Sequence, residues 1–316
     1  MVSLLDIPRE VRHKILTFVV STPKPPPSGH SDAGPRIRLP YSPCKGWHRN
    51  VQYCPHMNRT KEFSTLLVNR QLHDETLAAI DLLSRKPTYI LDIMVVDGRS
   101  LWPTWLSVPA LSKSVDIVYS TLRIDTTSSD MTMSGFQRGS GGFPLITLSF
   151  YGVLERFLRV GPAVNPALQE EELISINILE IDVETPEERR GIQPSPESLK
   201  EFRCGWDTQP LRSELLVGFI TTYISILLYM GYHTAEYGSI LYERIGTIRV
   251  LRDGKLEREW DMAKGLRDIK FDESIGNVTR EERSEYFKKW KLQAYETRAQ
   301  LGLPVLPLDE DSTTST

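Results

Sequence analysis

The strongest constraint on the fold is a change in the spacing of apolar residues after position 86. Before it, apolar residues recur at helical spacing, whereas three later runs are short and rich in branched and aromatic residues, as strands are. These runs are 88–96 (TYILDIMVV), 115–124 (VDIVYSTLRI) and 174–183 (ISINILEIDV). Helical sequence at 144–160 and 215–232 alternates with them, which predicts strands covered by helices.

The predicted fold class is therefore α+β. We expect an N-terminal helical module (1–86) packed on a mixed α/β domain (87–308) with short strands, covering helices and an edge β-hairpin. The acidic, Ser/Thr-rich tail (309–316) is expected to be disordered. The unequal spacing of the strand-like runs does not support a solenoid repeat.

The hairpin is predicted at 245–260, where Asp253 and Gly254 suit the two central positions of a type I′ turn. Counting outward from this turn predicts the strand register, and neither face is purely apolar, so we expect a half-exposed edge. The predicted pairs are Leu251 with Leu256, Val250 with Glu257, Ile248 with Glu259 and Thr247 with Trp260.

Two helices are expected in the N-terminal module, at 7–20 and 62–83. In the first, Pro8 suits the opening position, Glu10 favours the N-terminal end, and apolar residues recur at helical spacing. The segment 21–59 between them is rich in Pro, Gly and Ser and is predicted to be a long loop. A last helix at 280–300 begins with the capping box formed by Thr279 and Glu282.

Composition restricts the function classes. The net charge is −3, with 38 basic and 41 acidic residues, which disfavours generic nucleic-acid binding. Three cysteines and an N-terminus without a signal-peptide pattern indicate a reducing compartment, the cytoplasm or nucleus. The uncharged run 215–232 just reaches the length of a membrane span, but its tyrosines, glycines and hydroxyl residues favour a buried helix, and no membrane partner is expected.

One loop contains the residue types of a metal site. Cys44, His48, Cys54 and His56 could supply thiolate and imidazole ligands to zinc, but their spacing fits none of the usual zinc patterns. An ordinary polar loop is the preferred interpretation. The glycines at 135, 139, 141 and 142 lack the lysine that a phosphate-binding loop requires. No cofactor is therefore expected.

The search for catalytic motifs finds none of the common nucleophile or metalloprotease signatures. His73 lies beside Asp74 and Glu75, but adjacent residues on a helix point to different faces. An enzyme with an unrecognised site remains an alternative, with candidate groups around His73 or around His233, Glu236 and Tyr237. A site assembled from distant residues leaves no motif in one sequence.

The N-terminal text SLLDIPREVRHKIL (3–16) resembles the start of an F-box, in which an apolar residue and Pro are followed by Glu and an amphipathic helix. Ile7, Pro8 and Glu10 occupy those places. The later text LLVNRQLHDETLAAI (66–80) is similar to a segment of fungal F-box-like proteins. The resemblance covers about a quarter of the chain, and the segment 21–59 is an insertion that an ordinary F-box lacks.

The resemblance implies a protein-interaction adaptor of the kind that serves as the substrate-recruiting subunit of an SCF-type cullin-RING ubiquitin ligase. Its partners would be a Skp-type adaptor and a protein substrate. The implied adaptor-facing residues are Leu5, Ile7, Pro8, Val11, Ile15 and Leu16. Two alternatives stay open: the same apolar stripe packs on the protein's own core, or the insertion 21–59 displaces the second helix and abolishes adaptor binding.

Overall fold

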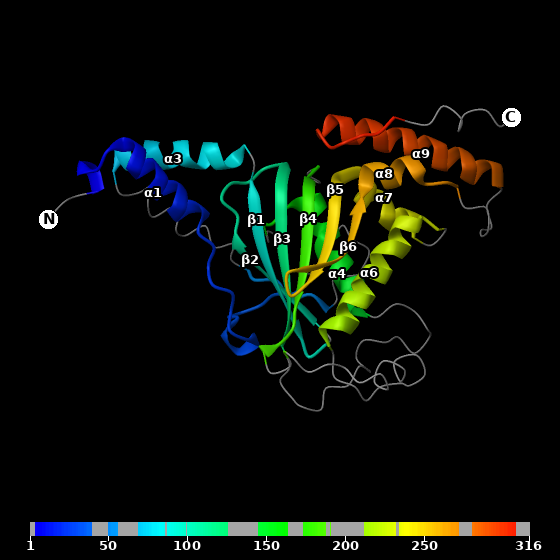
Figure 1. The fold of residues 1–316 in the computed structure, drawn as a ribbon, viewed down its shortest axis with the longest axis horizontal. Helices are drawn as coiled ribbons and strands as arrows, with labels where there is room; N and C mark the ends of the chain where they lie inside the picture. Colours follow the sequence, from blue (N-terminus) through cyan, green and yellow to red (C-terminus); the bar gives the residue numbers. More distant parts are fainter. Residues whose placement is uncertain are drawn as a thin grey trace.

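The computed structural model describes residues 4–39, 50–55, 69–85, 87–98, 100–125, 145–163, 173–187, 190, 212–231, 234–271 and 280–307. It is a mixed α/β fold built on one sheet, with two N-terminal helices at one end (Figure 1). The predicted fold class is confirmed.

The sheet has six strands in the order β2-β1-β3-β4-β5-β6. The inner strands β1, β3, β4 and β5 are parallel, and β2 and β6 pair antiparallel at the two edges. Their bounds are β1 Thr88–Val96, β2 Ser100–Ser107, β3 Ser114–Asp125, β4 Ser175–Glu184, β5 Ile245–Arg252 and β6 Lys255–Asp261. Because parallel strands all start at the same end of the sheet, the chain must return along the strand length between them, which requires a long crossover.

Helices α4 (Leu145–Val160) and α6 (Ser213–Tyr229) form the layer that buries one face of this sheet. Figure 1 shows α4 behind the strands. Phe157 of α4 contacts Tyr89 and Trp105 edge-on or tilted, with ring centroids 6.1 and 5.0 Å away. The predicted helix at 215–232 is thus confirmed as a largely buried helix up to Tyr229, where α6 ends. Among the described helices, none combines the length and apolar character needed to cross a bilayer.

Helices α7 (Ala235–Arg244), α8 (Met262–Asp268) and α9 (Arg280–Gln300) pack around the start of β5. Asp261 caps α8 by accepting a hydrogen bond from the Lys264 amide. The helix at 280–300 was predicted, whereas α7 and α8 were not. Thr279 of the predicted capping box lies outside the described residues.

The hairpin at the sheet edge confirms part of the predicted register and corrects the rest. Leu251 pairs with Leu256, as predicted, but a bulge between Val250 and Leu251 shifts every later pair by one residue. Ile248 therefore pairs with Trp260 instead of Glu259. The physical reason is burial: the shift places Trp260 beside Ile248, on the face that the helices cover, where it packs on the core. The predicted pairs Val250 with Glu257 and Thr247 with Trp260 are wrong for the same reason, since Val250 pairs with Arg258 and Thr247 with Asp261.

The N-terminal part consists of the short 3-10 turn η1 (Leu4–Asp6), helix α1 (Arg9–Ser21) and helix α3 (Arg70–Ser84). Asn69 caps α3 by accepting a hydrogen bond from the Leu72 amide. Residues 62–68 of the predicted second helix lie outside the described residues. Figure 1 shows α1 and α3 side by side, beyond the β2 end of the sheet.

The described parts of the insertion, 21–39 and 50–55, contact the sheet. The Lys24 amide donates to the Leu106 carbonyl, and Arg36 donates to the Pro103 carbonyl, both on β2. Further along, a bridge joins Val51 to Leu101, and Val51 is fully buried. The prediction of a loop holds for most of 21–39, but the insertion also supplies core residues that composition did not indicate.

Candidate functional site

The candidate site is the two-sided helix α1. One side, formed by Arg12, Leu16 and Val20, is buried. Leu16 is 2% exposed and shares a small apolar cluster with Leu72 and Ala79 of α3. This cluster is separate from the main core of the sheet, so the α1–α3 pair has a miniature core of its own.

The other side of α1 carries apolar residues that face solvent. Val11 is 44% exposed and Phe18 is 70% exposed. The exposed Pro8 precedes them, and the half-buried Ile15 lies between them. The spacing 8, 11, 15 and 18 places all four on one face of the helix. We name Pro8, Val11, Ile15 and Phe18 the α1 stripe. A continuous apolar face of this kind marks a surface suited to a partner.

A buried ion pair holds α1 against α3. Arg12 donates from Nε and Nη2 to the two carboxylate oxygens of Glu75, at 2.9 and 2.6 Å. The same guanidinium donates to the carbonyl of Leu5 at 3.1 Å and to that of Ile7. Arg12 thus ties the chain before α1 to α3.

The hydrogen bond from Arg12 lowers the pKa of the Glu75 carboxyl from 4.5 to about 2. Desolvation would raise this pKa but is outweighed. A hydrogen bond from Gln71 lowers it further. Between these pKa values the unfolded chain binds the proton more tightly than the folded chain. The stability from this pair is therefore fully present above pH 4.5 and is lost as the pH falls toward 2.

We expect Glu75→Gln to remove this acid dependence. The difference in unfolding free energy between wild type and Glu75→Gln should be constant above pH 5 and shrink as the pH falls toward 2. Chemical denaturation of both proteins across this pH range measures the difference. The other carboxylates are the same in both proteins, so their contributions cancel. A difference that is flat down to pH 2 would contradict the assigned pair.

The residues that the F-box resemblance implied fall on both sides of α1. Leu5, Pro8 and Val11 are exposed, and Ile7 and Ile15 are half-buried. Leu16 is buried against α3, where it supports the helix pair and is not at the surface. Phe18 was not among the implied residues, although its helical spacing from Val11 and Ile15 was visible in the sequence.

The remaining sequence candidates do not converge in the described part of the chain. Glu75 turns inward to Arg12, whereas His73 lies on the outer side of α3 beside Asp74, at 3.2 Å. Cys44, His48, His56 and His233 lie outside the described residues, as do the glycines at 135–142. No group of three or more metal-ligating side chains gathers within the described ranges.

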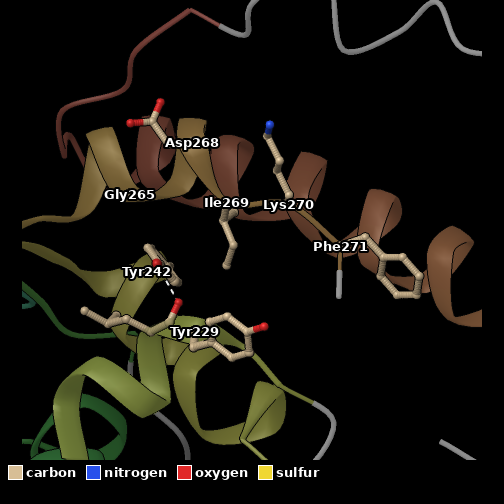
Figure 2. Close-up of a pocket in the computed structure, with 8 residues that line it drawn as sticks. Tyr229, Tyr242, Gly265, Asp268, Ile269, Lys270 and Phe271 are labelled. Carbon is tan, nitrogen blue, oxygen red and sulfur yellow. Dashed lines mark hydrogen bonds between the residues drawn. The ribbon is translucent and has the colours of Figure 1, made fainter. Parts of the chain in front are cut away.

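A surface depression lies where α6, α7 and α8 meet. It is an open depression of about 510 Å³. Figure 2 shows Ile269 pointing into it, toward Tyr229 and Tyr242, whereas Asp268 and Lys270 point away. Tyr242 donates its hydroxyl to the Leu228 carbonyl, and burial raises its pKa to about 12. The side chains facing the depression are therefore apolar or already engaged in the fold.

Comparison with known proteins gives no relative for this site. No protein-family model, curated protein or solved structure matches the chain.

Proposed function

We propose that this protein is a protein-interaction adaptor whose α1–α3 pair binds a Skp-type adaptor of a cullin-RING ubiquitin ligase, with the sheet domain recruiting a protein substrate. The observation that carries the proposal is the exposed α1 stripe on a helix whose opposite side is already buried. An apolar face at this spacing suits packing against a helix of a partner.

The path of the insertion supports the same proposal. Although residues 21–59 separate the two halves of the resemblance, α1 and α3 pack directly on one another through Arg12 and Glu75. The described part of the insertion contacts β2 instead, through Lys24 and Arg36. It therefore leaves the α1–α3 pair assembled.

The test is binding of the full chain to the purified Skp-type adaptor, measured by calorimetry. We expect the double variant Val11→Asp/Phe18→Asp to weaken binding at least about tenfold, since charges in the centre of an apolar contact must be desolvated. Both side chains are exposed, so the variant should keep the circular dichroism spectrum of wild type. A matched control, Leu292→Asp on the exposed side of α9, should bind as wild type does.

A folded wild-type chain that does not bind the Skp-type adaptor would overturn the ligase role. Equal binding by wild type and the Val11→Asp/Phe18→Asp variant would remove the α1 stripe from the interface, and with it the observation on which the proposal rests.

A further inference from the structure

The second face of the sheet is covered over β1, where Met94 and Val96 pack with Ala33 and Trp102, but the described residues leave it open over β3, β4 and β5. On the face that α4 and α6 cover, Val118, Leu179 and Ile248 are at most 3% exposed. Their neighbours on the opposite face are open: Tyr119 is 39% exposed, and Glu180 and Arg249 are half-buried. No described helix covers this middle part. Sheets with parallel inner strands usually carry helices on both faces, and within the described ranges this part of the face lacks that second layer.

The strand register defines the open face as two adjoining rows. One row crosses five strands through Ile90, Tyr119, Glu180, Arg249 and Glu259. The row before it along the parallel strands contains Ile117, Ile178 and Thr247. Apolar groups thus gather over β1, β3 and β4, and charged groups gather beside them over β4, β5 and β6.

The open face is strongly acidic. Including the next residues along the strands, its charged groups are five carboxylates besides the buried Asp92, which pairs with Arg123, and two guanidinium groups, an excess of four negative charges in all. The whole chain has a net charge of only −3. The charged members are Asp92, Glu180, Asp182, Glu184, Glu259, Asp261, Arg123 and Arg249.

The two arginines of this face are already engaged. Arg123 donates to both carboxylate oxygens of Asp92, at 2.6 and 2.9 Å, and Arg249 donates to Glu259 at 2.7 Å. Burial raises the pKa of Glu184, and the nearby carboxylates of Asp182 and Asp92 raise it further, against the opposing effect of Arg123. The potential over β4 is therefore negative, and cations would relieve it.

We propose that the open face binds a basic amphipathic helix of a partner protein. A helix about 10 Å in diameter covers two strands. Laid along β3 and β4, its apolar side would contact Ile117, Ile178 and Tyr119. Lysines or arginines at its edge would reach Glu180 and the carboxylates beyond it. Such a helix supplies both the missing layer and the missing positive charge.

The test uses the full chain and two labelled synthetic peptides, one a leucine–lysine amphipathic helix and the other its leucine–glutamate counterpart. Fluorescence anisotropy should show binding of the lysine peptide alone. Glu180→Lys should raise its dissociation constant about tenfold, and Tyr119→Ala about threefold. The control Glu285→Lys makes the same charge change on an exposed position of α9 and should leave the constant within about twofold. The Val11→Asp/Phe18→Asp variant should bind the peptide normally, which separates this surface from the proposed adaptor surface.

Three results would overturn the proposal. The first is no binding of the lysine peptide by folded wild type. The second is equal weakening by Glu180→Lys and Glu285→Lys, which would mean that the peptide follows overall charge only. The third is self-association of wild type in sedimentation that Glu180→Lys abolishes, which would assign the face to a second copy of this chain.

Discussion

Replacing Gly238 with alanine is expected to lower the free energy of unfolding by about 3 kcal/mol, a large part of the stability of an ordinary domain. Gly238 lies in α7 where this helix crosses the end of α6. A Cβ atom there would overlap the carbonyl oxygen of Leu227 and lie 2.7 Å from the sulfur of Met230. The carbonyl belongs to backbone, so the two helices would have to move apart.

Gly218 provides the matched control for this substitution. It also lies in a helix, α6, but it is exposed, and a Cβ atom there meets nothing within 4 Å. Gly218→Ala should therefore stabilise the protein by up to about 1 kcal/mol, because alanine favours a helix more than glycine does. Urea denaturation of both variants tests the pair. A Gly238→Ala protein as stable as wild type would show that α6 and α7 are not in close contact.

Buried strands made of apolar residues could be predicted from the sequence, whereas elements that depend on tertiary contacts could not. The bounds of β1 are those predicted, because TYILDIMVV is apolar enough to belong to a core. Strand β2 was missed because Pro103 argues against a strand, although proline is tolerated there since β2 is an edge strand. Helix α7 was missed because Gly238 reads as a helix breaker until its contact with α6 is known.

The candidate surfaces were predictable to different degrees. The exposed side of α1 follows from its apolar spacing, but its buried side depends on Arg12, which looks like an ordinary surface residue until Glu75 of α3 is placed opposite it. The open face of the sheet is also indicated by a local sequence pattern. Residues 179–184 (LEIDVE) alternate apolar and acidic, which is typical of a strand with one covered and one open face.

The burial of Arg298 could not be predicted from the sequence. Its place among the charged residues of α9 suggests a solvated side chain, yet it is 0% exposed. Its Nε donates to the Pro304 carbonyl at 2.9 Å, and Nη1 donates to the carbonyls of Ile245, at 2.7 Å, and Tyr242. These acceptors join the segment after α9 to the junction of α7 and β5.

We expect Arg298→Leu to destabilise the protein by about 3 kcal/mol. Burial lowers the pKa of Arg298 to about 10, which shows that its charge is costly to bury. Hydrogen bonds from a charged donor contribute about 1.5–3 kcal/mol each, and three carbonyls would lose theirs. The three bonds therefore outweigh the cost of the charge. Arg298→Lys should recover little, because one ammonium cannot span acceptors on two segments.

Urea denaturation against the control Lys288→Leu, on the exposed side of α9, measures this balance. The control should change the unfolding free energy by less than about 0.5 kcal/mol. Replacing a buried charge with an apolar side chain is neutral or stabilising when desolvation exceeds the hydrogen bonds. An Arg298→Leu protein as stable as wild type would therefore show that desolvation dominates here, and that α9 is held to α7 and the core by its apolar contacts through Trp290 and Ala294.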